Sequence, residues 1–274
     1  MAEVKLSGQA LLADVGAANP PAGSLAFWWM GQGSVIVKGA GRVLYIDPYL
    51  NPDPRRQTPP LLKPEEVTNA DFVLLTHDHS DHIDPHAIPG IAKASPQARF
   101  VVSWPNVARL ESLGVRLDRI LGLGHGATLQ EEGVTIHGFK SKHEFFDEDP
   151  ELGFPHMGYV VDLAGARFYH PGDTIPWEGM IAGLKALAPQ AAFLPINGRD
   201  GERYRRHTIG NCTFQESVDI AGEVGLKLAV PVHYDMFAGN PGSPPDFLDY
   251  LNAKYPEVDS WVGMAGERVE RRLA

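Results

Sequence analysis

The sequence has little cysteine and no long apolar run. Cys212 is its single cysteine, so the chain can form no internal disulfide, as is common in a reducing compartment. Gln9, Asp14 and several glycines interrupt the first 19 residues, and neither a signal peptide nor a membrane span is visible. We therefore expect a cytoplasmic protein with no membrane partner.

Basic residues are also scarce relative to acidic ones. Lysine and arginine total 24 against 34 aspartates and glutamates, a formal net charge of -10. Nucleic acids and anionic membranes both favour a basic protein surface, so we expect neither as a partner. A small-molecule substrate remains compatible, even an anionic one, because a few arginines can dominate a single pocket. The sequence is compatible with a homo-oligomer.

The 274 residues, 43% of them hydrophobic, are enough for one large core. We see no long linker and treat residues 1–274 as one domain. Strand, turn and strand patterns come early in each half, and helices alternate with strands later. This order predicts two sheet-plus-helix layers packed face to face, an α/β sandwich.

Several helix boundaries have local signals in the sequence. Asp84-Pro85 predicts the start of a helix over 86–93, and Gly114 the end of one over 105–113. Thr213 and Glu216 have the spacing of a capping box, which predicts a helix that stops before Gly225. We expect further helices over 177–187 and 246–254. The expected strands are 26–29, 34–38, 42–46, 72–75, 99–103, 127–130, 134–139, 158–163, 167–170, 191–196 and 228–232.

The densest group of chemically active residues follows the apolar run 72–75. It comprises His77, His79, Asp81 and His82. An apolar run that ends in polar residues is typical of a buried strand that leads into a loop at a sheet edge. Imidazole and carboxylate groups together suit zinc, manganese or iron. The alternative is a solvated polar loop that caps the next helix, but three histidines and an aspartate within six positions favour a metal site.

Four more candidate residues follow predicted strands: Asp47, His143, Asp173 and His233. With the histidine loop, this set can build a site for two metal ions. His77, His79 and His143 would hold one ion, Asp81, His82 and His233 the other, and Asp173 would bridge them. His137 is the alternative to His143, although it lies in mid-strand, where its side chain would enter the packed face. Asp47 is better suited to orienting a ligand histidine than to binding a metal ion directly.

Such a site would activate water. Ions held mainly by neutral imidazoles can lower the pKa of a shared water to roughly 7, and the resulting metal-bound hydroxide is a nucleophile. Asp81 is the catalytic candidate, because it could orient this hydroxide and then handle the proton.

Substrate contacts are expected from two further segments. The loop 197–211 carries four arginines, and Arg199 directly follows a strand, so it is our candidate for an anion clamp. A solvated arginine face is the alternative. His156 is our second candidate for a substrate contact. Cys212 precedes a helix N-terminus, but beside a metal site it is interpreted as a packing residue rather than a nucleophile.

The motif His77-x-His79-x-Asp81-His82, with its downstream histidines and aspartate, resembles the metallo-β-lactamase superfamily. The segment from Trp29 to Val35, followed by Asp47 after a strand, is also similar to the start of that superfamily. The resemblance extends from about Leu25 to beyond His233. It implies the four-layer αβ/βα sandwich and a binuclear metallohydrolase.

Within that superfamily, three segments most resemble the L-ascorbate-6-phosphate lactonase group: 81–84, 169–174 and 230–236. The chain is shorter than those lactonases and differs around His143, so the resemblance supports a lactonase-like relative. It implies two divalent ions, Mn²⁺ or Zn²⁺ with iron as a further option, and hydrolysis of a lactone or ester of a small, sugar-phosphate-like anion. The alternatives are a phosphodiesterase of the same fold and a non-catalytic sensor that binds metal or ligand.

Overall fold

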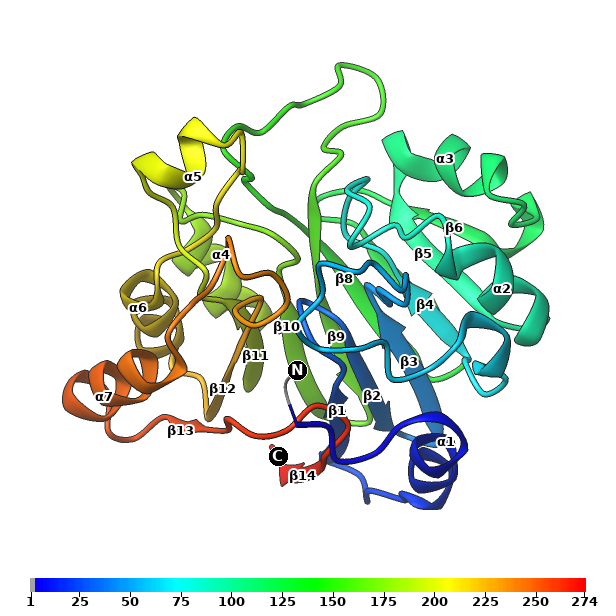
Figure 1. Ribbon diagram of the computed structural model, residues 1–274, viewed down its shortest axis with the longest axis horizontal. Helices are drawn as coiled ribbons and strands as arrows, with labels where there is room; N and C mark the ends of the chain where they lie inside the picture. Colours follow the sequence, from blue (N-terminus) through cyan, green and yellow to red (C-terminus); the bar gives the residue numbers. More distant parts are fainter. Residues whose placement is uncertain (1–2) are drawn as a thin grey trace.

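Two seven-stranded sheets face each other in the computed structural model, which describes residues 3–274 (Figure 1). The first sheet has the order β14-β1-β2-β3-β4-β5-β6 and the second the order β13-β12-β11-β10-β9-β8-β7. The strands of the first are β1 (Ser24–Trp29), β2 (Val35–Gly39), β3 (Arg42–Ile46), β4 (Phe72–Leu74), β5 (Arg99–Ser103), β6 (Ile120–Leu123) and β14 (Arg268–Arg272). Those of the second are β7 (Thr128–Glu131), β8 (Val134–Lys140), β9 (Met157–Leu163), β10 (Ala166–His170), β11 (Ala191–Pro195), β12 (Leu228–Val232) and β13 (Asp259–Ser260).

Helices cover the outer faces of both sheets. Figure 1 shows α2 and α3 beside β4 to β6 on one side, and α4, α6 and α7 beside β10 to β12 on the other. The α-helices are α1 (Gly8–Ala17), α2 (Ala87–Ala94), α3 (Val107–Ser112), α4 (Met180–Leu187), α5 (Gly201–Arg205), α6 (Phe214–Val224) and α7 (Pro244–Lys254). Short 3-10 helices are η1 (Pro64–Glu66), η2 (Trp104–Asn106) and η3 (Leu117–Arg119). The predicted four-layer αβ/βα sandwich is therefore confirmed. No helix in the described part of the chain has the length and apolarity to cross a membrane.

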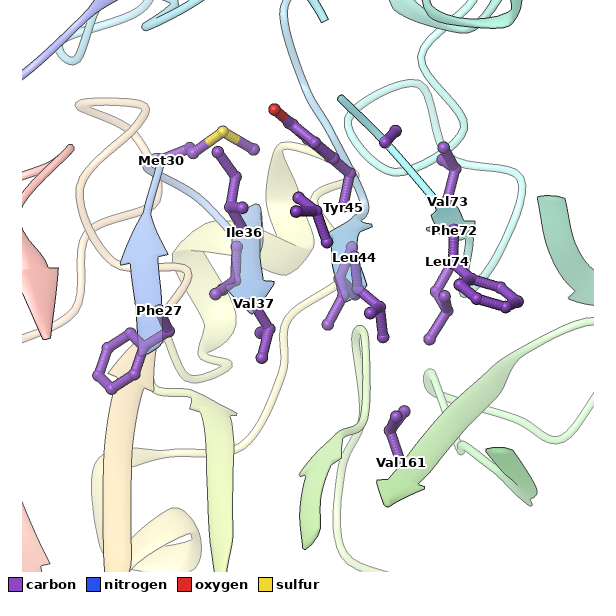
Figure 2. Packing of buried hydrophobic residues seen from close by; sticks show 14 of the residues in the cluster. Phe27, Met30, Ile36, Val37, Leu44, Tyr45, Phe72, Val73, Leu74 and Val161 are labelled. Carbon is purple, nitrogen blue, oxygen red and sulfur yellow. The ribbon is translucent and has the colours of Figure 1, made fainter. Parts of the chain in front are cut away.

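The inner faces of the two sheets bury the main core. Phe27 of β1 meets Phe193 of β11 edge to face, with ring centroids 5.2 Å apart. Figure 2 shows Leu44 and Leu74 of the first sheet on the side that faces Val161 of the second. Burying each such side chain contributes about 1.5–3 kcal/mol relative to leaving it exposed. Because both sheets contribute to one core, their edges are fixed relative to each other.

Strand direction gathers the candidate residues at one edge. The neighbours β3, β4 and β5 are parallel, as are β10, β11 and β12. Parallel neighbours end at the same sheet edge, so Asp47 after β3 lies near the histidine loop after β4. For the same reason His233 after β12 lies on the edge where β10 leads to Asp173.

Most predicted helix boundaries agree with the structure to within a few residues. The Thr213–Glu216 capping box is present, and Gly225 ends α6 with φ +80°. The helix expected over 86–93 begins at Ala87, while the Asp84 carboxylate accepts a hydrogen bond from the His86 backbone N–H. The helix expected from 177 begins at Met180 because Gly179 has φ +90°. Helices α1 and α5 had not been predicted.

Candidate metal centre

A buried carboxylate after β3 orients the histidine loop. Asp47 has φ +44°, and its side chain accepts three hydrogen bonds. The His82 Nδ1–H donates at 2.7 Å, the Thr76 backbone N–H at 2.9 Å and the Thr76 hydroxyl at 2.7 Å. The structure thus places Asp47 where the sequence had assigned it, behind a candidate ligand histidine.

The same network sets the tautomers of two histidines. Because the Thr76 hydroxyl donates to Asp47, its oxygen is free to accept from His77 Nδ1, which lies 3.0 Å away. Protons on the Nδ1 atoms of His77 and His82 leave both Nε2 atoms with a free lone pair. Imidazole Nε2 in this form is a metal ligand.

The candidate ligands form two neighbouring groups. One consists of His77, His79, His143 and Asp173, and the other of Asp81, His82 and His233. Within each group the possible ligand atoms lie within 4.8 Å of one another. The structure therefore brings all seven predicted ligand residues together in two groups, and Asp173, which the sequence analysis expects to bridge them, belongs to the first group.

Asp173 lies between the two groups. Its Oδ1 is 3.3 Å from His82 Nε2 and 3.2 Å from His233 Nε2, while its Oδ2 is 3.6 Å from His143 Nε2. Gly172 before it has φ +64°, and a Cβ at that position would lie 2.4 Å from Thr76 Oγ1. Glycine therefore lets the Asp173 loop close onto the histidine loop.

The residues fit a divalent metal ion. Among residues 3–274, the buried atoms His82 Nε2 and Asp173 Oδ1 have no hydrogen-bond partner, although they face several charged groups. Buried polar atoms are normally satisfied, so two such atoms that converge on one place are suited to hold a cation between them. Imidazole and carboxylate donors also match the ligand preferences of zinc, manganese and iron.

Electrostatics within the site differ between the groups. Burial lowers the pKa of His77 well below its usual value and lowers that of His143 to about 4, so both are neutral ligands near pH 7. Burial acts in the same direction on His82 and His233, but the negative charges of Asp173 and Asp81 outweigh it and raise the pKa of both. The second group thus favours positive charge, which a metal ion would supply.

His137 does not reach this cluster. It lies within β8, where its Nδ1 is 2.9 Å from the hydroxyl of Thr128 on β7. His143 instead follows β8, and its ring centroid is 5.0 Å from that of His79. Of the two alternatives left by the sequence, the structure places His143 at the centre.

The two predicted substrate contacts have different positions. His156 packs beside the cluster, with its ring centroid 5.0 Å from that of His77, but it does not line the adjoining cavity. Arg199 lies outside that cavity, and both terminal nitrogens of its guanidinium donate to Glu216 at 2.6 Å. The structure therefore does not bring Arg199 to the metal centre.

An open cavity of about 740 Å³ leads to the cluster. Five of the seven ligand candidates lie on its surface: His79, Asp81, His143, Asp173 and His233. Its wall also includes Gln32 and Arg206, which the sequence analysis had not assigned. The motif from Trp29 to Val35 was the available signal for Gln32, and the arginine-rich loop was the signal for Arg206.

Known proteins resemble this chain over most of its length. The family model described as β-lactamase superfamily domain matches residues 42–234. A UPF0173 metal-dependent hydrolase of Myxococcus xanthus is 31% identical over 225 residues, which cover 79% of this chain and 72% of the relative. Another UPF0173 metal-dependent hydrolase, from Archaeoglobus fulgidus, is 29% identical over 248 residues, which cover 88% of this chain and 97% of the relative.

A solved structure supports the fold. Igni18, described as a novel metallo hydrolase from Ignicoccus hospitalis, superposes with a TM-score of 0.72 at 22% identity, covering 90% of this chain and 98% of that one. These likenesses do not distinguish lactonases from other hydrolases, so the substrate stays a prediction.

Proposed function

Because this chain belongs to the β-lactamase superfamily, we propose that it is a metal-dependent hydrolase with a binuclear centre. Its substrate would be a lactone or ester of a small anionic molecule, as in the L-ascorbate-6-phosphate lactonase group. The observation that carries the proposal is the position of Asp173, whose two carboxylate oxygens face two separate groups of candidate ligands. A bridging carboxylate is the feature that couples two ions in one active site.

His77, His79 and His143 would hold one ion and Asp81, His82 and His233 the other, with Asp173 shared. When bound, such ions make water nucleophilic near neutral pH and polarise the bond to be broken. The protein's own part is to hold the ligands. Asp47 and Thr76 fix the rings of His82 and His77 from behind, so both Nε2 atoms point to the centre.

Asp81 is the residue best placed to act on the reacting water. It lies on the cavity surface, and its Oδ2 is 3.6 Å from His233 Nε2. Burial raises the pKa of this carboxyl, but the charges of His82 and His233 outweigh burial and hold it well below its usual range. The carboxylate is therefore ionised, and its oxygens can orient a water molecule by accepting a hydrogen bond from it.

The substrate anion would be bound by Arg206. Arg206 lines the cavity, and its partners within the described residues are both distant: Glu202 Oε1 at 3.5 Å and the Glu202 carbonyl at 3.4 Å. Arg55 lines the same cavity but forms a close ion pair with Asp53. Arg206 is thus the cavity arginine whose charge is least neutralised, and it replaces Arg199 as the proposed anion contact.

Turnover by single variants tests the mechanism. In metal-loaded protein, Asp81→Ala should abolish hydrolysis of a phosphorylated sugar lactone while the protein remains folded. Asp78→Ala is the matched control, because Asp78 lies in the same loop but pairs with Arg109 at 3.0 Å, away from the cluster. Undiminished turnover in Asp81→Ala would overturn the role given to this carboxylate.

Substrate preference tests the second part of the proposal. A panel of phosphorylated lactones, neutral lactones and bis-aryl phosphates should show the highest kcat/KM for the phosphorylated lactones. Arg206→Ala should raise KM for anionic lactones more than tenfold and leave neutral ones nearly unchanged, whereas Arg199→Ala should do neither. Preferential cleavage of the bis-aryl phosphates would instead identify a phosphodiesterase.

A further inference from the structure

Gln32 lies in the turn between β1 and β2, directly beside the second group of ligands. It is buried and has φ +53°, a left-handed backbone conformation that residues other than glycine rarely adopt. Hydrogen bonds hold its backbone in this conformation: its N–H donates to Asp235 Oδ1 at 3.1 Å, and its carbonyl accepts from the His233 N–H at 2.9 Å. The rest of the structure thus imposes an unfavourable backbone at a position that faces the metal centre.

The side-chain amide of Gln32 makes contacts with two ligand candidates. Its Nε2 is 2.8 Å from Asp81 Oδ2 and 3.0 Å from His233 Nε2. No other described residue outside the two groups lies within hydrogen-bond distance of both atoms. In this orientation the amide N–H group donates to the Asp81 carboxylate.

Rotation about the last side-chain bond exchanges the nitrogen and oxygen of a glutamine amide. A cation bound by Asp81 and His233 would repel the N–H group and would take up the His233 lone pair. The same cation would attract the amide oxygen. Metal binding would therefore reverse the preferred orientation and turn Oε1 toward the two ligand atoms.

The separation of the Gln32 amide from the two ligand atoms, which is a hydrogen-bond distance, is also one that neighbouring ligands of a single ion adopt. Ligands at about 2.1 Å from an ion are about 3.0 Å apart at right angles and about 3.4 Å apart in a tetrahedron. The distances of 2.8 and 3.0 Å from the Gln32 amide match the right-angle value. With Gln32 Oε1 and the shared Asp173, the second ion would have five protein ligands, a number that manganese and iron accept more readily than a tetrahedral zinc site does.

We propose that Gln32 Oε1 is an additional ligand of the ion held by Asp81, His82 and His233. This inference rests on the metal centre proposed above and makes its second group richer in oxygen. It predicts that Gln32 affects the binding of one ion and leaves the other unchanged, since its amide contacts only the second group.

Chelator-competition titrations of Mn²⁺ and Co²⁺ test the proposal without an activity assay. Gln32→Ala should weaken binding of one ion at least tenfold and leave the other within threefold. Gln32→Glu keeps an oxygen at this position and should bind that ion as tightly as the unaltered protein or more tightly. Gln190→Ala is the matched control, because Gln190 accepts a hydrogen bond from the Arg167 N–H at 2.8 Å outside the metal centre.

The outcomes separate the possible roles of the amide. If Gln32 only donated a hydrogen bond to Asp81, Gln32→Glu would set two carboxylates against each other and weaken binding as the alanine does, which would overturn the proposal. Unchanged binding in both variants would also overturn it. The second Co²⁺ equivalent should give the weak visible absorption of five or six ligands rather than intense tetrahedral bands. Failure of the unaltered protein to bind two ions would refute the binuclear centre itself, and thermal unfolding of each metal-free variant will show whether it has folded.

Discussion

Replacement of Asp47 by asparagine should weaken metal binding although Asp47 touches no ion. The change removes the buried carboxylate oxygen that accepts from His82 Nδ1 at 2.7 Å and from the Thr76 hydroxyl at 2.7 Å. An asparagine can still accept from the Thr76 backbone N–H, but its amide nitrogen cannot accept from His82. Loss of such an orienting partner costs 10- to 100-fold in metal affinity, about 1.4–2.7 kcal/mol.

Competition with a chromophoric chelator measures this loss for the metal-loaded protein. Asp84→Asn is the matched control: Asp84 is as fully buried, but its carboxylate accepts from the backbone N–H groups of Leu50, Asn51 and His86 and contacts no candidate ligand. The control should change affinity less than threefold. Equal affinity in Asp47→Asn and the unaltered protein would refute the claim that Asp47 orients His82, and equal losses in both variants would point to general loosening of the fold.

Three further predictions address other parts of the structure. His143→Ala should lower the number of tightly bound ions from two to one, as measured by elemental analysis, whereas His137→Ala should not, because His137 contacts Thr128 instead of the cluster. Gly172→Ala should lower the free energy of unfolding, measured in urea, by about 1–3 kcal/mol, because the added Cβ would lie 2.4 Å from Thr76 Oγ1. Gly41→Ala is the control: Gly41 also has a positive φ, +74°, but a Cβ there meets open space, so this variant should lose less stability. Equal losses in the two variants would contradict the steric argument. Burial raises the pKa of the Cys212 thiol to about 12, so iodoacetamide at pH 8.5 should alkylate it only after denaturation, and rapid reaction of the folded protein would contradict its assignment as a packing residue.

The sequence allowed the ligand cluster to be predicted because each ligand follows an apolar strand. Parallel pairing then places Asp47 near the loop after β4 in one sheet and Asp173 near His233 in the other, and the face-to-face packing of the sheets brings the two edges together. The sequence left a choice between His143 and His137 because β8 is long and half-exposed, so its pattern does not show where the strand ends.

Interactions between distant residues were beyond the sequence. Glu216 forms part of a local capping box, and nothing in that motif shows that it also binds the guanidinium of Arg199. Gln32 lies in the motif from Trp29 to Val35, but its contacts are with residues 49 and 201 positions away, which that local motif does not show. Helix α5 carries a local signal that was overlooked, since the Asp200 side chain accepts from two backbone N–H groups at its start.

Anomalous scattering from crystals of the metal-loaded protein, collected at the absorption edge of the bound metal, tests the binuclear centre most directly. The arrangement of the ligands predicts two peaks in each chain. One should lie among His77, His79 and His143, the other among Asp81, His82 and His233, and both should be within bonding distance of Asp173. A single peak, or peaks away from Asp173, would contradict a shared bridging carboxylate and with it the proposed mechanism.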